Sequence, residues 1–580
     1  MSLFGQTNCV GLRTLFKTLN PSPPLPRPPF EDHRAMISIR MAASRIVQRS
    51  GIIGIRSFSS VSPVGGNNDG KTEPPPWWRQ SSSASVVTSI TDADVASASS
   101  SPSMMTETLT SPTQPAASIS EEGGERQRYS HYMWGTSRKG TIPIKLLVEP
   151  RISAPSFIVS STATSANGDD GSPASSPTTP PVKENASSSR TTSTGGGGLF
   201  SSDEKVIDHP MRLSFDEGTT SSSSLRAFLF GENSNNDDYD DTIYLDKVYC
   251  GASGTALILN DGRCFVLGSN KNGELGIGQS MKETTTPIHL PIPDPVAKVS
   301  LGPNFSAIQS TAGDIYTFGY GGSRINGLGC LGHGNMESYY APKLVESLIE
   351  DGCYAADVHC GEYSMTVLTT EGEVLTCGAG SYGRLGNLET LDQLYLEPVE
   401  LLGAGQGDVT QIACGHSFSL ALNVDGIVHA WGRNNEGQLG TGMGLAADMY
   451  AMESLPRPIE GQLEGRSVVR VAAGHTHAAA VTSDGALFTW GMNFTHEPKL
   501  ETTLLHTRIV DVACGQNYTL ALDESGRVYS MGKGSKMGVL GLASVRASAY
   551  PILVEGIPED EKVVSMSCGW THVAVSTVVK

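Results

Sequence analysis

The chain has 580 residues, a formal net charge of −18 and ten cysteines. Its length allows several ordinary domains, or one large domain with tails. The acidic balance is a poor match for phosphate backbones, so direct nucleic-acid binding is not expected. The sequence has no CxxC pair, which removes the common zinc and thioredoxin signals, and no run of about 18 apolar residues, so no transmembrane segment is expected.

Residues 1–60 are predicted to be a mitochondrial transit peptide with an upstream extension. The segment that begins at Met36 is rich in Arg and Ser and contains no acidic residue up to position 60. Its apolar residues Ile39, Ala43 and Val47 have helix-like spacing, which is typical of mitochondrial import signals. We therefore expect a mitochondrial protein, in the matrix or associated with the inner membrane. Plastid import and an untargeted basic tail are the alternatives.

Composition divides the remaining chain into four parts. Residues 61–125 are predicted to be a disordered linker, and residues 156–241 a disordered Ser/Asp-rich insertion, because both have few large apolar residues. Such segments bury too little apolar surface to offset the entropy lost on ordering. The folded part is expected in residues 126–155 and 242–580.

A repeat of three glycines runs through residues 242–580. In six successive units the first glycine is followed by a second glycine eleven residues later and a third seventeen residues later. Five units have a cysteine just before the first glycine, where a small buried apolar side chain is expected and not a disulfide. The first glycines are Gly251, Gly302, Gly361, Gly415, Gly474 and Gly515, and Gly569 begins a seventh unit.

Each unit is predicted to contain a β-hairpin. In the unit Cys414–Gly432, apolar residues alternate with small or polar residues over 418–422, which predicts a half-buried strand. Asp425 and Gly426 form a hairpin signal, because type I′ turns require positive φ. A second strand follows at 427–431. The longer stretch to the next unit can hold further strands, and units of four strands are typical of propeller blades.

A further element follows the third glycine of several units. The segment Gly432–Gly440 matches Gly268–Gly276 and Gly378–Gly386, and each ends in Leu-Gly. The leucine is predicted to anchor the core, and the glycines to form turns.

The seventh unit predicts how the ring closes. Its second glycine would fall at Lys580, so the second half of the hairpin is missing there. Trp134 and Gly135, followed by Gly140, look like that missing half. An N-terminal strand within 126–155 would therefore complete the last blade and remove two free sheet edges. The expected fold is an all-β seven-bladed propeller that loses its structure when 129–148 is deleted, but not when 160–235 is deleted.

The repeats resemble those of the regulator of chromosome condensation family. The resemblance rests on CGHSFSLALNVDGIVHAWGRNNEGQLG, from Cys414, and CGASGTALILNDGRCFVLGSNKNGELG, from Cys250. It covers the closing strand and 242–580, and it implies a seven-bladed propeller with strand-swapped closure. The family's functions include guanine-nucleotide exchange on small GTPases, chromatin binding, ultraviolet perception and organelle assembly. The import signal makes the chain most similar to the mitochondrial branch.

The sequence departs from the plant photoreceptors of that family. Those members carry many tryptophans in GWRHT-type motifs, whereas here only Trp570 lies in such a place. Ultraviolet sensing is therefore not expected.

Four histidines are candidate partner contacts, together with Trp570. They lie one or three residues after a first glycine, so their turns should gather on one propeller face around the channel. Hydrogen bonding between blades is the alternative role for them. These histidines are His416, His475, His477 and His572.

Two long connections are further candidate surfaces. The stretch Thr441–Arg466 holds Met449, Tyr450 and Met452 and is richer in apolar residues than a solvated loop requires. It is expected to form a short helix that caps the ring, or an adaptable partner surface. The stretch Tyr320–Asp351 is the second, and exchange factors of the family are similar in using a projecting blade insertion against the GTPase.

No catalytic residue, cofactor site or metal site is predicted. The Gly-rich segment 319–329 lacks the Lys-Ser/Thr of a phosphate loop. We expect a non-enzymatic protein-binding platform that acts in mitochondria, in the assembly or regulation of a larger complex. The alternative is a guanine-nucleotide exchange factor for a small or dynamin-like GTPase. A hydrolase or lyase that uses His475 and His477 is a third hypothesis.

Overall fold

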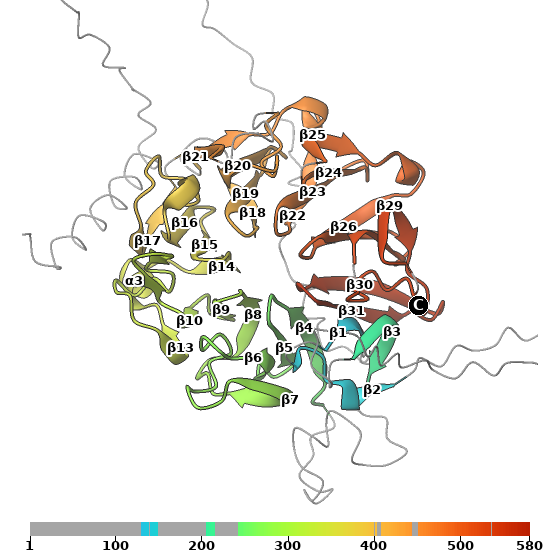
Figure 1. The fold of residues 1–580 in the computed structure, drawn as a ribbon, viewed down its shortest axis with the longest axis horizontal. Helices are drawn as coiled ribbons and strands as arrows, with labels where there is room; N and C mark the ends of the chain where they lie inside the picture. Colours follow the sequence, from blue (N-terminus) through green and yellow to red (C-terminus); the bar gives the residue numbers. More distant parts are fainter. Residues whose placement is uncertain are drawn as a thin grey trace, which may run out of the picture. The chain divides into compact units, whose positions relative to one another are not determined.

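Seven antiparallel sheets surround a central channel in the computed structural model of the chain (Figure 1). The structure describes residues 129–137, 140–148, 205–214, 242–399, 401–402, 408–442, 450–492, 494–534, 536–543 and 545–580. The predictions for 1–60 and 61–125 lie outside these residues. No helix within them is long and apolar enough to cross a membrane. The predicted seven-bladed propeller is confirmed.

Blades 1 to 3 each contain four strands that follow one another from the channel outward. Blade 2 also carries a separate two-stranded hairpin, β11 and β12, and one short helix, α3. Their bounds are β4 Leu245–Cys250, β5 Gly254–Leu259, β6 Cys264–Ser269 and β7 Glu283–Leu290; β8 Val296–Leu301, β9 Phe305–Ser310, β10 Ile315–Gly319, β11 Gly322–Ser323, β12 Gly327–Leu328, β13 Tyr339–Leu344 and α3 Glu346–Glu350; β14 Ala355–Cys360, β15 Ser364–Thr369, β16 Val374–Gly378 and β17 Gln393–Pro398.

Blades 4 to 6 repeat the same order of four strands. Short 3₁₀ turns lie at Ser381–Gly383, Gly461–Leu463 and Thr502–Leu504. The strands are β18 Val409–Cys414, β19 Phe418–Asn423, β20 Val428–Arg433 and β21 Met452–Pro458; β22 Val468–Ala473, β23 His477–Thr482, β24 Leu487–Gly491 and β25 Thr495–Leu500; β26 Ile509–Cys514, β27 Tyr518–Asp523, β28 Val528–Lys533 and β29 Ala547–Leu553.

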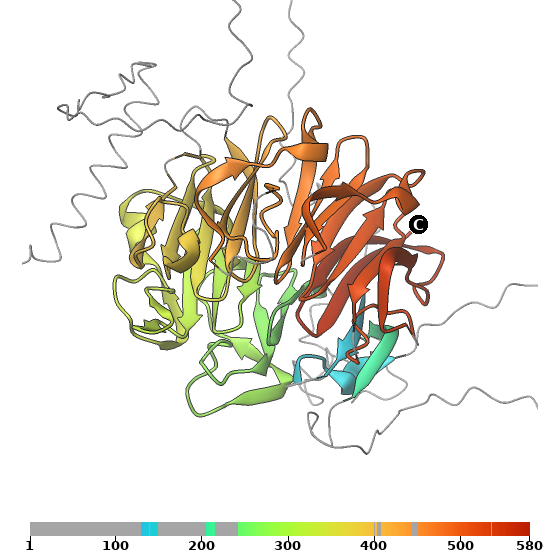
Figure 2. The ribbon, with the colours of Figure 1, turned by 45° about the horizontal axis from the view of Figure 1, so that its top comes forward.

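Blade 7 joins strands from both ends of the described chain, which lie side by side in Figures 1 and 2. Its order from the channel outward is β30, β31, β1, β3 and β2. A 3₁₀ turn at Ile144–Leu146 precedes β2. The bounds are β30 Glu561–Cys568, β31 His572–Val579, β1 Ser130–Thr136, β3 Val206–Leu213 and β2 Leu147–Val148.

The predicted closing strand is confirmed by the pairing of β1 with β31, in which Trp134 lies opposite Val573. His131 of β1 also reaches blade 1, where its Nε2 is 3.0 Å from the carbonyl oxygen of Leu245. The indole of Trp134 donates a hydrogen bond to the carbonyl oxygen of Val539 in blade 6, at 2.8 Å. One strand thus connects blade 7 with both of its neighbours.

The prediction of a disordered insertion over 156–241 is wrong for β3, which lies within it. β3 pairs with β1 and buries Ile207, Pro210 and Leu213. A register shift between Met133 and Gly135 interrupts this pairing, so every third residue of β3 is buried and not every second one. The strand therefore lacks the alternation that marks a strand in a sequence.

The expected capping helix is wrong for the part of Thr441–Arg466 that the structure describes beyond Tyr450. Met452 begins β21, the outermost strand of blade 4, and residues 443–449 lie outside the described part of the chain. In the other long connection, β11 and β12 form a hairpin outside the sheet of blade 2, with Ile325 at its tip.

In six of the seven units, crowding requires the first glycine. A Cβ at Gly415 would lie 2.0 Å from the ring of Phe418 and 2.6 Å from the carbonyl oxygen of Gly474 in the next blade. The second glycine has a different role, because Gly426 has a φ of +78° in the β19–β20 hairpin. The predicted hairpin is confirmed, but its turn is not type I′, because Asp425 lacks the positive φ that this turn requires at both central residues.

A plug turn fills six of the seven junctions between blades. We use this name for the turn after a third glycine that carries a buried Leu or Ile, and the prediction that its leucine anchors the core is confirmed. The turn of one blade packs against the residue just before the third glycine of the next blade; for example, a Cβ at Gly440 would lie 2.8 Å from Nε1 of Trp490. The buried plug residues are Leu275, Leu331, Leu385, Leu439, Leu540 and Ile142, in blades 1, 2, 3, 4, 6 and 7.

Two deletions test the role of β3. Removal of 160–200 leaves every described strand intact, so the melting temperature should stay close to that of the full chain. Removal of 160–214 takes away β3 and its buried Ile207 and Leu213, each of which contributes about 1.5–3 kcal/mol on burial. Thermal unfolding followed by circular dichroism measures both. Equal melting temperatures for the two deletions would show that β3 does not support the ring.

Candidate functional site

The innermost strands of the seven blades line a channel with a cavity of about 300 Å³. The five cysteines that precede a first glycine lie half-buried in its wall, and none of the nine cysteines in the described ranges forms a disulfide. Burial raises the pKa of Cys360 and of Cys514 to about 12. Because the thiolate is the reactive form, these thiols are weak nucleophiles and metal ligands.

A chain of backbone hydrogen bonds joins neighbouring turns at one end of the channel. The amide of Glu362 donates to the carbonyl oxygen of His416, at 3.1 Å. His416 donates in turn to His475, at 3.3 Å, and His475 to Gln516, at 3.2 Å. The amide of Trp570 donates to Gly251 across the closing junction, at 3.1 Å. These bonds tie four of the turns to the blade beside them at the channel mouth.

The residue after each first glycine forms a ring of side chains at this mouth, which we call the rim. All seven rim residues are half-buried, whereas the glycines before them are buried. The seven side chains are of six kinds, although their backbone positions are equivalent. The rim consists of Ala252, Pro303, Glu362, His416, His475, Gln516 and Trp570.

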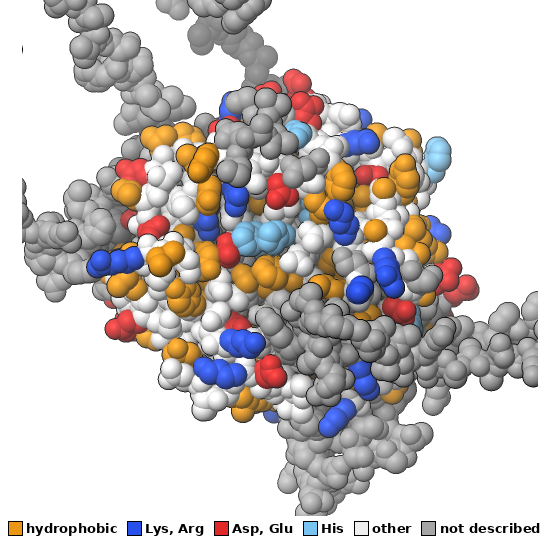
Figure 3. Space-filling view, viewed as in Figure 1, with side chains coloured by type: hydrophobic (Ala, Val, Ile, Leu, Met, Phe, Trp, Pro, Cys, Tyr) orange, Lys and Arg blue, Asp and Glu red, His pale blue; other side chains and the backbone are white. Residues whose placement is uncertain are grey.

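Four rim residues form a continuous polar and aromatic cluster. The ring centroids of His416 and His475 are 4.1 Å apart, and that of Trp570 lies 5.7 Å from His475 and 6.4 Å from His416. Nε2 of His416 is 3.1 Å from a carboxylate oxygen of Glu362. Figure 3 shows His side chains beside an acidic side chain at the centre of this face.

The surroundings of His475 determine its protonation state. Burial, together with the nearby His416, lowers its pKa to about 4. His475 is therefore neutral near pH 7 and presents one hydrogen-bond donor and one acceptor. Trp570 adds an aromatic face, and Glu362 adds a negative charge.

His477 and His572 do not belong to the rim, and their burial is incompatible with the predicted partner contact. They start strands β23 and β31 between blades, with exposures of 6% and 0%. Nε2 of His477 is 3.1 Å from the hydroxyl of Thr519 in blade 6, and Nε2 of His572 is 2.7 Å from that of Thr255 in blade 1. For these two residues, the structure agrees with the alternative role, which is hydrogen bonding between blades.

The remaining candidates lie elsewhere. Tyr450 and Met452 are 74% and 44% exposed beside and on β21, away from the rim, and Met449 lies outside the described residues.

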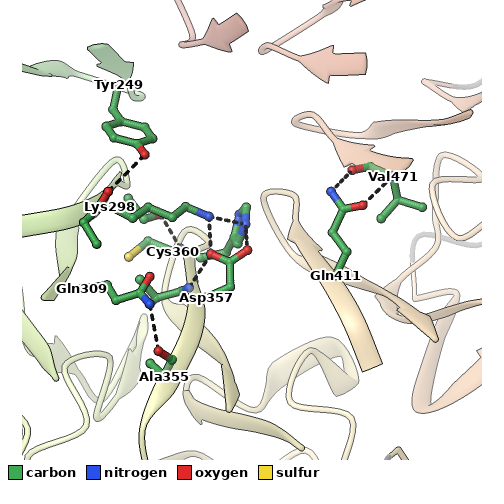
Figure 4. A network of polar contacts seen from close by, with 12 residues as sticks. Tyr249, Lys298, Gln309, Ala355, Asp357, Cys360, Gln411 and Val471 are labelled. Atoms are coloured by element: carbon green, nitrogen blue, oxygen red, sulfur yellow. Dashed lines mark hydrogen bonds and ion pairs between the residues drawn. The ribbon is translucent and has the colours of Figure 1, made fainter. Parts of the chain in front are cut away.

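Sequence reasoning missed a second polar group, deeper in the channel wall (Figure 4). Lys298 forms an ion pair with Asp357, and its Nζ lies 3.0 Å from Nε2 of His359. Burial alone would raise the pKa of Asp357, but Lys298 and His359 outweigh it and hold the pKa below its usual value. Their place in the repeat could have revealed this pair, because Lys298 and Asp357 are both the third residue of an innermost strand.

The channel wall also links the blades through uncharged groups. The side-chain amide of Gln411 donates to the carbonyl oxygen of Val471 at 3.0 Å and accepts from its amide at 3.1 Å (Figure 4). The amide of Cys360 donates to the hydroxyl of Ser300 at 2.9 Å. The wall groups are thus engaged with one another, whereas the rim cluster faces outward.

Buried histidines make the propeller sensitive to acid. Burial lowers the pKa of His477 to about 4 and that of His572 to about 3. Because these values lie below the unfolded value near 6.5, the unfolded chain binds more protons below that pH, and stability falls as the pH drops from about 6.5 towards 4. Each histidine contributes up to about 1.4 kcal/mol per pH unit.

Urea unfolding between pH 7.5 and pH 4.5 measures this dependence. The variant His572→Gln should show a shallower loss of stability over this range than the unchanged chain. An equal slope in both proteins would contradict the assignment of a neutral, buried His572.

Comparison with known families agrees with this architecture. Residues 230–502 match the RCC1-like domain, and residues 509–536 and 525–576 match regulator of chromosome condensation (RCC1) repeats.

The relatives found by sequence are diverse. The chain is 29% identical over 350 residues to the E3 ubiquitin-protein ligase HERC2 of Mus musculus, an alignment that spans 57% of this chain and only 7% of HERC2. It is 27% identical over 344 residues to the ultraviolet-B receptor UVR8 of Arabidopsis thaliana, across 57% of this chain and 74% of the receptor. It is 29% identical over 299 residues to the secretion-regulating guanine nucleotide exchange factor of Bos taurus, across 48% and 60%.

Solved structures show the same fold. The crystal structure of human WBSCR16 aligns with 78% of this chain and 99% of its own, with a TM-score of 0.55 and 19% identity. That of Prp20p from Saccharomyces cerevisiae aligns with 79% and 93%, with a TM-score of 0.56 and 17% identity. The glycine repeat, the blade count and the matched families agree: the chain contains an RCC1-like domain with RCC1 repeats, folded as a seven-bladed propeller.

Proposed function

We propose that this chain is a non-enzymatic protein-binding platform and that the rim is its recognition surface. The observation that carries the proposal is the contrast between backbone and side chains at the channel mouth. Backbone hydrogen bonds join neighbouring turns, and the seven equivalent rim positions carry side chains of six kinds, which differ in shape and charge. A rigid frame with varied side chains suits specific recognition, because little side-chain or loop entropy is lost on binding.

The chemistry of the cluster fits a protein partner. Trp570 offers an aromatic contact, and the neutral His475 can both donate and accept a hydrogen bond. Tryptophan is enriched among the residues that dominate protein interfaces. By contrast, His477 is engaged between blades, which speaks against the hydrolase or lyase hypothesis that depends on it.

We further propose that the platform acts in mitochondria, in the assembly or regulation of a larger complex. The support is the Arg-rich, acid-free segment that begins at Met36. Placement in a mitochondrial branch of the family rests on the same segment.

A double substitution at the rim tests the proposed platform. The full chain is fused to a proximity-labelling enzyme, and its labelled neighbours are compared with those of His416→Ala/Trp570→Ala. The platform should label subunits of one mitochondrial complex, and the rim variant should lose them while its melting temperature changes little.

The matched control is Val424→Ala, at an exposed hairpin position of blade 4 outside the rim. An unchanged set of labelled proteins in the rim variant would contradict the rim as the binding surface. A location outside mitochondria would contradict only the proposed compartment.

Guanine-nucleotide exchange is the second candidate function, favoured by the β11–β12 hairpin. It lies outside the sheet of blade 2, and its tip residue Ile325 is 94% exposed. The amide of Leu328 at its base donates to the carboxylate of Asp392 in blade 3, at 3.1 Å, which supports the hairpin from the side. A relative of similar sequence is itself a guanine nucleotide exchange factor.

Release of labelled GDP from a panel of small and dynamin-like GTPases tests this second candidate. The full chain should accelerate release from one of them, and Ile325→Asp should reduce the acceleration by about tenfold through loss of an apolar contact. Val424→Asp is the control for an added surface charge. If no GTPase in the panel responds to the unchanged chain, the exchange function is rejected.

A further inference from the structure

The junction between blades 5 and 6 differs from the other six, because the described residues of blade 5 form no plug turn. Between the third glycine of this blade, Gly491, and β25, which starts at Thr495, the described residues are Met492 and Phe494. In blade 4, the corresponding stretch carries Leu439, which is fully buried against blade 5. Blade 5 therefore offers nothing equivalent to fill the space beside blade 6.

A pocket lies where the missing turn would pack. Its volume is about 500 Å³, larger than that of the central channel, and its lining is mostly apolar. The lining includes Met492, Phe494, Met531 and Tyr550, of which Phe494 and Tyr550 are 71% and 63% exposed. Figure 3 shows hydrophobic side chains together with Lys and Arg side chains over blades 5 and 6.

The residue before the third glycine of blade 6 supports the same comparison. Met531 holds this place, whereas blades 4, 5 and 7 have Trp431, Trp490 and Trp134 there. Each of those indoles donates a hydrogen bond to a carbonyl oxygen in the plug turn of the preceding blade, at 2.8–3.1 Å. Blade 6 thus lacks the tryptophan, and blade 5 lacks the turn that would receive its hydrogen bond.

Thr519 marks where a backbone carbonyl would bind. In blades 1 and 2, the residues in the same place are Thr255 and Ser306, four positions after the first glycine. Their hydroxyls donate to carbonyl oxygens of the preceding plug turns, those of Thr141 at 2.6 Å and Glu274 at 2.7 Å. Thr519 lines the pocket at the equivalent place.

Glu501 replaces a carbonyl of the missing turn on the other side of the junction. In blades 2 and 3, Thr317 and Thr376 donate to the carbonyl oxygens of the plug leucines, at 2.9 and 2.8 Å. Thr489 holds the same place in blade 5 and donates to the carboxylate of Glu501, at 2.9 Å. Together, Thr489 and Thr519 show that the polar positions for a plug turn persist although the turn does not.

We propose that this pocket binds a leucine-bearing glycine turn of a partner protein, which takes the place of the missing plug turn. The six filled junctions identify the occupant: an apolar side chain of leucine size, with a backbone carbonyl directed at Thr519. Lys499 and Lys533, which also line the pocket, favour an acidic residue beside that leucine. Asn517 of the pocket directly follows the rim residue Gln516, so one partner can contact both. The inference rests on the proposed function and adds the chemistry of the partner.

A peptide with the sequence of residues 432–441, which contains the plug turn of blade 4, tests the pocket directly. The full chain is labelled at its methionine methyl groups, and NMR spectra are recorded during titration with this peptide. The signals of Met492 and Met531 should shift, because both residues line the pocket. A peptide in which Ala replaces the residue corresponding to Leu439 should shift them at much higher concentration, with binding weaker by about tenfold or more.

Two variants and one control accompany the titration. Met531→Trp introduces the indole found in three other blades, fills the pocket and should abolish the peptide shifts at Met492. Tyr550→Ala removes an exposed aromatic side chain from the pocket wall and should weaken binding several-fold, so the test stands even if the first variant fails to fold. Met336→Trp, at a 48% exposed position outside the pocket, should bind the peptide normally.

The outcomes separate this inference from the proposed function. If the peptide leaves Met492 and Met531 unchanged, or binds equally well to Met531→Trp, the pocket is not a receptor for such a turn, whatever partners the rim binds. Met531→Trp could also lower the melting temperature of the full chain and expose a segment to proteolysis. That result would show that a segment of this chain occupies the pocket, and it would overturn the proposal of a partner turn. If the peptide binds but the rim variant labels the same proteins as the unchanged chain, only the rim is rejected as a binding surface.

Discussion

The pairing of β1 with β31 is the interaction on which the ring depends. His131 and Ser576, whose side chains are 2.9 Å apart in this pair, are separated by 445 positions in the sequence. The entropic cost of closing so long a loop grows only with the logarithm of its length, so one well-packed strand can offset it. Without β1, blade 7 would keep only β30 and β31, and the outer edge of β31 would be exposed. The position of Trp570 in the rim depends on that blade.

The chemistry of the molecule follows from how its repeats agree and where they differ. Equivalent backbone positions produce the hydrogen bonds of the channel mouth, the crowded first glycines and the plug turns. The side chains at the rim are free to vary because no repeat-wide contact constrains them. The pocket between blades 5 and 6 arises in the opposite way, by loss of one repeated element. The varied rim side chains and the lost plug turn are both departures from the repeat. Both lie at surfaces that a partner can reach.

Much of the fold could be predicted because glycine positions record backbone geometry. The hairpins, the blade count and the role of Trp134 follow from fixed spacing alone. β3 could not be predicted, since a bulge in its pairing with β1 removes the alternation of buried residues and Pro210 weakens any strand signal. His475 and His477 lie one and three residues after Gly474, but the sequence alone did not show which of these two places faces the channel mouth and which is buried between blades. Only the turn between them decides which side chain meets solvent.

The same topology has a consequence for synthesis of the chain. β1 is made long before β31, at about 5–20 residues per second, so it waits for its partner for roughly 20–90 seconds. During that time Tyr132, Met133 and Trp134 lack the β31 partners that cover them in the ring. Unpaired apolar strands of this kind are where nascent chains aggregate or bind chaperones. The nascent propeller therefore keeps the apolar strand β1 without its β31 partner until the last blade is synthesised.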